Sequence, residues 1–422
     1  MTENRYLYLL IFAVMALYAP AIFYLPSLDD IYHLNHAKEF GLNIFMPSDG
    51  VIFRPWQIII NGLNYKLFSR QVYFTESLNI LFYGLNIYLL YRLSERLFGR
   101  GGHNLFVAFI YAFHSVNTAS VIQMDTISQN LNSTAILLLL IYLLKAGKNY
   151  FIFLGLFLFL LGTKETSYGV AAAVPFAFYF ISRDTKTSLR LFGCFLGAFA
   201  LYMLCRYQIS VFPFAEHLQQ VQEGKGYGLV TNVKNIMLNL VMMFGSVFFL
   251  GNTQDLFLSG DLRKIFLGLG VFLSFVFMVA AVRGCYAKHL KQEVVFLLLF
   301  AAAACFPSAF FAGRVSELYS SLLTPFIALA VGYYAYNGFS QRWRQVFVGI
   351  YLVISVTAIV SKSNGYKEVG ERFWAFSEQL IPVCQSSPQI ICLYGNDFPS
   401  GYSVKEYSVF TVHNPYLLHN ID

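Results

Sequence analysis

Apolar segments long enough to cross a lipid bilayer recur along the whole sequence, and they limit the folds that the chain can adopt. A membrane helix needs about 20 mostly apolar residues. Only 12% of the residues are charged, whereas soluble domains carry about 25%, so charge is too scarce to cover a water-facing surface. The sequence therefore predicts an all-α polytopic membrane protein with about 11 transmembrane helices, at residues 6–25, 76–98, 104–122, 132–145, 150–163, 168–182, 189–207, 265–282, 294–311, 318–336 and 345–362.

Basic residues assign the two sides of this membrane domain, because cytoplasmic loops gather Lys and Arg. Such residues occur in five predicted loops, at about residues 92–100, 145–148, 183–190, 283–291 and 342–344. If all five lie inside, 265–282 makes the only return crossing after 189–207, and the apolar stretch 235–251 lies in or dips into the outer leaflet. The N-terminus is then cytoplasmic and the C-terminus periplasmic or lumenal. A bacterial inner membrane is the expected location.

The net charge of +7 follows from these loops and does not indicate nucleic acid binding. A nucleic-acid module would show basic residues clustered on a soluble face and interleaved with aromatic residues, and no such cluster is present in the sequence. The expected surroundings of the chain are membrane lipids.

A long outer region, at about residues 26–75, contains the stretch FRPWQIIINGLNYKLF. Pro55 suits the first position of a helix, and apolar residues from Trp56 to Leu67 then recur at helical spacing. We expect a helix with one apolar side that lies on the membrane.

The tail, residues 363–422, is the second long outer region. Its stretch QIICLYGNDFPSGYSVKEYSVF is typical of short strands and turns. The chain is thus predicted to comprise a membrane domain, 1–362, and a small α/β outer segment, 363–422. Cys384 and Cys392 in this segment can pair in an oxidising compartment.

Two adjacent carboxylates, Asp29 and Asp30, follow the first predicted span within LPSLDDIYHLNHAKEF. A carboxylate at the outer membrane surface can act as a general base that removes a proton from an attacking hydroxyl. The alternative is a helix start whose acids lie near the positive end of the helix dipole. His33 and His36 would hold a metal only with a third ligand, so no metal site is predicted, and a divalent cation is permitted but not indicated.

Lys164 and Glu165 interrupt the apolar run from Phe151 to Ile181 with the letters TKETS. The run is too long for one membrane helix and predicts two short helices joined by a tight outer turn. Ionisable residues this close to hydrocarbon usually face a cavity. We therefore expect Lys164 to neutralise a phosphate and Glu165 to orient it; a simple ion pair within the turn is the alternative.

Three arginines are candidates for binding the same phosphate. Arg314, in FFAGRVSELYSSLLTP, lies between two predicted spans on the outer side, where a guanidinium can hold a phosphate through two parallel hydrogen bonds. Arg54 and Arg206 lie at the outer ends of their segments. For each of the three, the alternative is an interfacial side chain that reaches ordinary lipid headgroups.

A polar rim separates two predicted spans in AFHSVNTASVIQMDTISQNLNSTAILLLLIYLL. His114, Gln123 and Asp125 lie at and beyond the top of one span and before the next. Side chains of these types can bind a sugar, and we expect them to contact the substrate. A water-facing hairpin is the alternative.

Together these stretches resemble the C-type glycosyltransferases of membranes. The likeness lies in LDDIYHLNHA, FRPW, the polar stretch that begins AFHSVNTASVIQMD, and LLGTKETSYGVAAAVPFAFYF. The sequence is most similar to protein O-mannosyltransferases and their tetratricopeptide-bearing relatives. GRVSELYSSLLTPFIAL is a looser match to their Arg-x-x-x-Tyr-like element, with Arg314 and Tyr319 in place. The likeness covers about residues 6–182 and 310–330.

The resemblance implies an enzyme that transfers a sugar from a polyprenyl-phosphate carrier to an acceptor on the outer side, with inversion and without a firmly implied cofactor. By position, Asp29 matches the family's catalytic acid and Asp30 its neighbour, while Lys164, Glu165 and Arg314 match residues near the carrier phosphate. The sequence has neither a tetratricopeptide array nor an inserted lumenal domain. The acceptor is therefore open among a glycan, a lipid and a protein.

Two other classes compete with this interpretation. A secondary transporter would have repeated halves and interrupted helices that meet at the bilayer midplane, whereas the unusual polar residues here gather at one membrane face. An O-antigen polymerase or ligase has similar hydropathy, but its large outer loops fall in the later half of the chain. Here the richest loop is the first.

Overall fold

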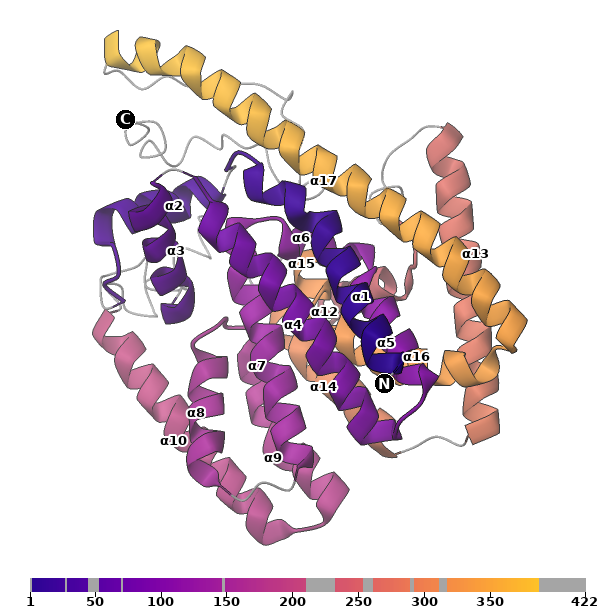
Figure 1. Ribbon diagram of the computed structural model, residues 1–422. Helices are drawn as coiled ribbons and strands as arrows, with labels where there is room; N and C mark the ends of the chain where they lie inside the picture. The colour runs from indigo at the N-terminus through magenta and orange to yellow at the C-terminus, as the bar shows by residue number, and fades with distance from the viewer. Residues whose placement is uncertain are drawn as a thin grey trace.

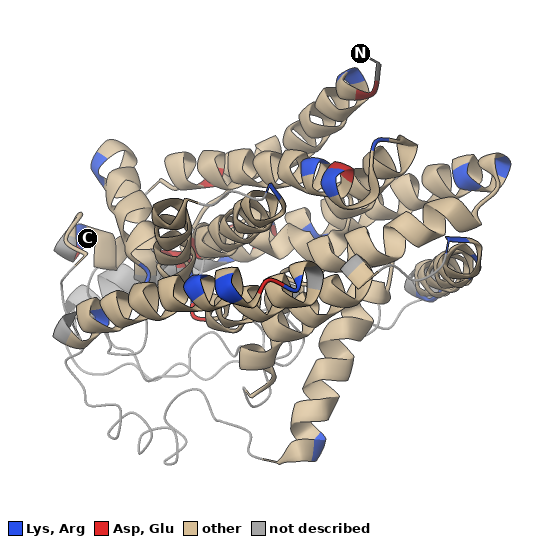
Figure 2. Cartoon of the chain, turned by 90° about the horizontal axis from the view of Figure 1, so that it is seen from below, with Lys and Arg blue, Asp and Glu red and all other residues tan. Residues whose placement is uncertain are grey.

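The computed structural model describes residues 2–26, 29–44, 53–69, 71–145, 149–209, 232–252, 261–288, 292–310 and 317–386. Within these ranges every regular element is helical and no strand occurs. The helices form a bundle with α17 lying obliquely along one side (Figure 1), and long stretches of most helices carry no charged residue (Figure 2). The predicted all-α polytopic membrane fold is confirmed for this part of the chain.

The long helices follow the predicted spans closely. By length and composition, five stretches of the described residues can cross a membrane: Glu3–Phe23, Met124–Leu144, Thr185–Tyr207, Lys264–Lys288 and Gln341–Arg372. The helices of the bundle are α1 (Thr2–Tyr18, continued by η1, Ala19–Phe23), α4 (Tyr73–Phe98), α5 (Gly102–Ala112), α7 (Ile127–Leu144), α8 (Tyr150–Leu161), α9 (Ser167–Ser182), α10 (Thr185–Ile209), α12 (Val233–Phe248), α13 (Asp261–Lys288), α14 (Gln292–Ala309), α16 (Thr324–Gly338) and α17 (Gln341–Ser386).

The predicted span 104–122 is wrong at its outer end. α5 stops at Ala112, and three short helical turns, η2 (Ser115–Asn117), α6 (Thr118–Val121) and η3 (Met124–Thr126), lead into α7. Side chains satisfy the carbonyl groups at the end of α5, because Tyr83 donates its hydroxyl to the carbonyls of Tyr111 and Ala112 at 2.9 and 3.1 Å. A helix end capped in this way does not need to continue.

Two helices of the first outer region, α2 (Asp29–Phe40) and α3 (Pro55–Phe68), pack on each other at one end of the bundle (Figure 1). The side of α3 that faces the protein is polar, with Gln57, Asn61 and Asn64 buried. Trp56 and Leu67 are exposed on the other side. The predicted one-sided helix is confirmed, and its apolar side faces outward, as a helix lying on a membrane requires.

The last helix, α17, is 46 residues long and passes residue 362 without a break. The first part of the predicted outer segment is therefore helical, and Trp374 in it donates its indole N–H to the carbonyl of Pro26 at 2.9 Å. The strands predicted within 389–410 and Cys392 lie outside the described residues, as does the side chain of Cys384. The boundary between the two predicted domains stays a prediction.

Helix α12 covers part of the apolar stretch 235–251. It packs on α14 and on the short helix α15 (Glu317–Ser320) through Asn239, Met243 and Val247, which are buried at four-residue spacing. Whether this helix crosses the membrane stays open.

Helices α13 and α16 approach each other closely. A Cβ atom on Gly284 would collide with the carbonyl of Tyr334, so glycine lets the backbones of α13 and α16 touch.

Candidate functional site

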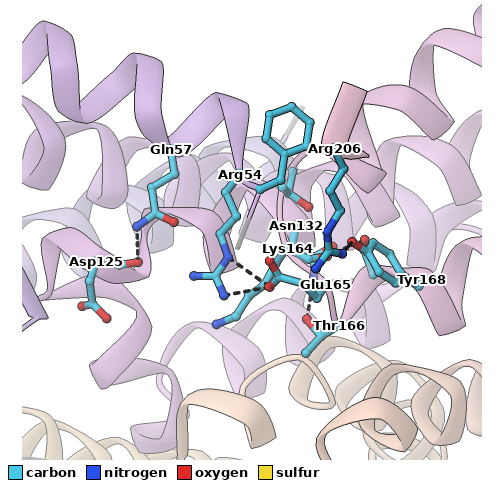
Figure 3. A network of polar contacts seen from close by, with 12 residues as sticks. Arg54, Gln57, Asp125, Asn132, Lys164, Glu165, Thr166, Tyr168 and Arg206 are labelled. Carbon is cyan, nitrogen blue, oxygen red and sulfur yellow. Dashed lines mark hydrogen bonds and ion pairs between the residues drawn. The ribbon is translucent and has the colours of Figure 1, made fainter. Parts of the chain in front are cut away.

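Segments that are far apart in the sequence converge at the end of the bundle where α2 and α3 lie. They are the starts of α2 and α3, residues 123–126 ahead of α7, the turn 162–166 between α8 and α9, and α15. Figure 3 shows part of this region, with dashed lines that join Arg54 to Glu165 and Gln57 to the backbone of Asp125. The predicted break at TKETS is confirmed, because α8 ends at Leu161 and α9 begins at Ser167.

An ion pair joins Arg54 to Glu165 (Figure 3). Pro55 begins α3, so the residue before it is held outside the helix and its side chain reaches the turn. Both Arg54 donors, Nε at 3.1 Å and Nη2 at 2.7 Å, bond the same oxygen, Oε2. Burial acts to raise the pKa of Glu165, but the charge and hydrogen bonds of Arg54 outweigh it and hold this pKa below its ordinary value.

Lys164 is the second cation of the site, with only 5% of its surface exposed. Its Nζ lies 5.5 Å from the ring centroid of Tyr319, the distance of a cation–π contact. Burial, and then repulsion by Arg54, lower the pKa of Lys164 to about 7. The two cations thus share the neighbourhood of Glu165, with Asp125 also acting on Lys164, and an added anion would relieve the repulsion between the cations.

Asp30 is the acid of the predicted pair whose side chain the structure describes. It is 6% exposed and accepts a hydrogen bond from the backbone N–H of Asp125 at 3.1 Å. Gln57 on α3 donates to the carbonyl of Asp125 at 2.8 Å, so α2, α3 and η3 are tied at one residue. Asp29 is the first residue of α2, and its side chain lies outside the described part of the chain.

His33 lies beside these groups, with Nε2 3.2 Å from Nε2 of Gln57. Burial, followed by repulsion from Arg54, lowers its pKa to about 3, so the ring is neutral. Among the described residues, no group of three His, Cys, Asp or Glu side chains is arranged to hold a metal ion. The role of a divalent cation stays a prediction.

Glu76 is an acidic residue of the site that sequence reasoning missed. It lies in the first turn of α4 and is 2% exposed. Its carboxyl group lies close enough to Asp30 and Asp125 to interact electrostatically with both. A signal was present in the sequence, since Glu76 and Asn79 place polar groups one helical turn apart at the start of a predicted span, and polar residues inside membranes usually mark functional sites.

The other candidate residues divide into three groups. Arg206 donates to the hydroxyl of Tyr168 at 3.1 Å and lies beside the Glu165 turn (Figure 3). The side chain of Gln123 is buried next to Asp125, whereas His114 is buried where α5 ends and donates to the carbonyl of Val247 at 2.8 Å. Arg314 lies outside the described residues, so its predicted phosphate contact stays a prediction.

The comparisons with known proteins bear on the fold. No protein-family model and no curated protein sequence matches the chain. The crystal structure of ArnT from Cupriavidus metallidurans bound to undecaprenyl phosphate is similar with a TM-score of 0.53 over 90% of this chain and 72% of that chain, at 11% identity. The chain has the fold of the C-type glycosyltransferases. The apo form of ArnT gives a TM-score of 0.50 over 94% of this chain and 67% of that chain, at 12% identity.

Proposed function

We propose that this protein is an integral membrane glycosyltransferase that moves a single sugar from a polyprenyl-phosphate donor to an acceptor on the periplasmic or lumenal side. The observation that carries the proposal is the meeting of two acids, the buried Asp30 and the partly buried Asp125, with the cations Arg54 and Lys164 in one site. The C-type fold supports it. The ArnT structure with undecaprenyl phosphate supports a polyprenyl-phosphate partner.

The mechanism that we propose uses an aspartate of the first outer loop as the base. The carboxylate removes a proton from the acceptor hydroxyl, whose oxygen forms a bond to the anomeric carbon while the bond to the carrier phosphate breaks. Arg54 and Lys164, together with the predicted Arg314, stabilise the charge on the departing phosphate. The base and the leaving group act on opposite faces of the sugar, so the anomeric configuration inverts.

The assignment of the base rests on two different arguments. The family resemblance points to Asp29, whereas the described geometry places Asp30 in the site with a backbone N–H bond from Asp125. A hydrogen bond of this kind favours the ionised carboxylate. We assign the base to Asp29 and give Asp30 the task of tying α2 to η3, and we test the two separately.

The proposed setting is a bacterial inner membrane with the N-terminus in the cytoplasm. The ends of α4, α9 and α13 lie toward one end of the bundle and α2 and α3 toward the other (Figure 1), which supports a site on the outer face. A glycan, a lipid and a protein are all candidate acceptors.

The experiment uses the full chain in nanodiscs with a panel of polyprenyl-phosphate monosaccharides and an envelope extract as the source of acceptor. Release of carrier phosphate is followed for the wild type and for Asp29→Asn, Asp30→Asn and Lys164→Ala, with Lys145→Ala at the other end of α7 as the matched control. We expect release from one donor, lost in Asp29→Asn and retained in Lys145→Ala. Release that survives both Asp variants would overturn the mechanism.

Two further outcomes would overturn the function itself. Movement of a solute into proteoliposomes without any change in a lipid-linked sugar would make the protein a transporter. Transfer of whole glycan chains rather than single sugars would make it a polymerase or ligase.

A further inference from the structure

Buried polar side chains in proteins nearly always have hydrogen-bond partners, so the exceptions call for an explanation. Among the described residues, most of the buried side-chain atoms without a partner belong to the candidate site or to the start of α7 beside it. They are Oε1 of Gln57, Oε2 of Glu76, Oε1 and Nε2 of Gln123, Oγ of Ser128, Oε1 of Gln129, Oδ1 of Asn132 and Oε1 of Glu165.

Hydrogen bonds join the segments that carry these atoms. The segment 123–132 supplies four of the residues, and Asn79 ties its start to α4 by donating to the carbonyl of Gln123 at 2.7 Å. Further along, Gln129 donates to the carbonyl of Leu318 at 2.9 Å, next to Tyr319. Asn132 donates to the hydroxyl of Thr166 at 3.4 Å, next to Glu165. The region therefore extends from the buried acids to the Lys164–Tyr319 contact.

Most of these atoms are hydrogen-bond acceptors. Gln57, Gln129 and Asn132 each use their NH₂ group on the protein, and their amide oxygens have no donor within the part of the chain that the structure describes. The carboxylate oxygens of Glu76 and Glu165 are acceptors too. Only the amide nitrogen of Gln123 and the hydroxyl of Ser128 can donate. A ligand that satisfies this region must bring several O–H donors of its own.

The charges of the surrounding residues narrow the class of ligand further. Asp30, Glu76 and Asp125 lie close enough to influence one another electrostatically, so a negatively charged group on the ligand would be repelled at the acid end. The cations Arg54 and Lys164 lie beside Glu165, where the carrier phosphate is proposed to bind. A sugar with free hydroxyls and no charge meets both requirements, because it supplies hydrogen-bond donors and carries no negative group.

We propose that the segment 123–132, with Gln57 and Glu76, forms the pocket for the transferred sugar and selects neutral, fully hydroxylated sugars over deoxy sugars and uronic acids. The inference rests on the proposed function and deepens it. A site built to bond a hydroxyl leaves its own groups unpaired when that hydroxyl is missing. Each lost hydroxyl should therefore weaken use of the donor by about tenfold or more.

Gln123 gives the sharpest test, because neither polar atom of its side chain has a partner among the described residues. Replacing it by methionine removes two buried, unpaired atoms, and a purely structural role predicts an unchanged or higher melting temperature. The pocket assignment predicts that Gln123→Met also lowers the preference for a hexose donor over the matching deoxyhexose donor from about tenfold to about twofold.

The matched control is Asn86→Leu in α4. Asn86 is an equally buried amide, but its NH₂ group donates to the carbonyl of Asn130 at 3.1 Å and its oxygen accepts from Thr134 at 2.7 Å. We expect this variant to lower the melting temperature and to leave the preference between the two donors unchanged. Asn132→Leu, as a second pocket variant, should act like Gln123→Met on the preference.

The readouts are carrier-phosphate release and equilibrium binding of the polyprenyl-phosphate hexose, deoxyhexose and hexuronic acid to protein in nanodiscs. Release by the wild type with an unaltered preference in both Gln123→Met and Asn132→Leu would overturn the pocket and leave the proposed function standing. Use of the hexuronic acid as well as the hexose would do the same. If no donor is bound or cleaved by the wild type, the proposed function fails and the inference fails with it.

Discussion

Two buried polar regions of this protein differ in how completely their hydrogen bonds are satisfied. One is the hub, residues 114–118, where α5 ends. The other is the candidate site. In the hub, Asn117 donates to Tyr83 and Tyr111 and accepts from Thr324 at 2.8 Å. Ser115 donates to the carbonyl of Gly251.

The hub also receives a buried cation from the last helix. Lys362 on α17 is 1% exposed and donates to the carbonyl of Ser115 at 3.0 Å. Tyr18 of α1 lies 3.3 Å from the hydroxyl of Thr118. The hub therefore joins helices from both ends of the chain by bonds completed within the protein, whereas several acceptors of the site have no donor among the described residues. We infer that the hub holds the bundle together and that the site is shaped for a ligand.

The largest expected effect distinguishes the ion pair Arg54–Glu165 from the ion pair Arg92–Glu95. Arg54→Leu removes a cation that the proposed mechanism places at the departing phosphate, and it should lower carrier-phosphate release by about 10²–10³-fold. The matched control is Arg92→Leu, near the C-terminal end of α4. Arg92 and Glu95 form an ion pair of 2.7 Å, the same distance as between Arg54 and Glu165. We expect the control to keep activity within about twofold, as exposed ion pairs contribute little. Equal losses in both variants would contradict the assignment.

The second prediction concerns the hub. Asn117→Leu leaves buried hydroxyl and carbonyl groups without their partner, and we expect the free energy of unfolding to fall by about 2–4 kcal/mol. The rate of carrier-phosphate release per folded molecule should not change. Thermal unfolding in detergent, together with the activity of the folded fraction, checks both parts. A loss of activity without a loss of stability would contradict the prediction and show that the hub takes part in catalysis.

The third prediction is a pH dependence of donor binding. The pKa of Lys164 is lowered to about 7, so Lys164 is charged below pH 7 and loses its proton as the pH rises through 7. A phosphodiester donor binds the charged form better, so its affinity should fall by up to about tenfold between pH 6 and pH 8. Lys164→Arg keeps its charge throughout this range and should flatten the profile. A wild-type affinity that rises with pH would contradict this role.

The smallest expected effect tests the helix that reaches back to the first loop. Trp374→Phe removes the hydrogen bond to the carbonyl of Pro26, which precedes the acidic pair, at a cost of about 1 kcal/mol. We expect kcat/KM for the donor to fall by about two- to fivefold. Trp343→Phe is the control, because Trp343 is exposed at the start of α17. An unchanged kcat/KM in Trp374→Phe would show that Pro26 is positioned by other contacts.

Sequence reasoning predicted the parts of the site that break a membrane pattern. The acids after the first span, the ionisable turn at TKETS and the proline after Arg54 are each unusual in an apolar chain. The structure bonds Arg54 to Glu165 and Asp30 to Asp125, and Gln57, one turn after Arg54, also bonds Asp125. Sequence reasoning could not predict where α5 ends, because that end depends on a hydrogen bond from the hydroxyl of Tyr83, which lies 28 residues away from Tyr111 in the sequence.

The sequence also could not separate binding amides from structural ones. Gln123 and Asn86 are both uncharged amides in apolar surroundings, and no local pattern distinguishes them. Only the tertiary contacts show that Asn86 has partners at both of its polar groups while Gln123 has none among the described residues. His114 illustrates the reverse case, since a side chain expected to contact a sugar lies in the hub, bonded to Val247.

The orientation of α3 bears on how a substrate would arrive. Its polar side carries Gln57 to the site, and the exposed apolar residues Trp56 and Leu67 lie on its other side. Under the proposed function, this apolar side rests against lipid, and fatty-acid chains of the outer leaflet complete the wall around Arg54. A lipid-linked sugar would then enter sideways, by diffusion within the leaflet. Bilayer thickness and lateral pressure would act on the height of that arginine, so the reaction rate would depend on membrane composition.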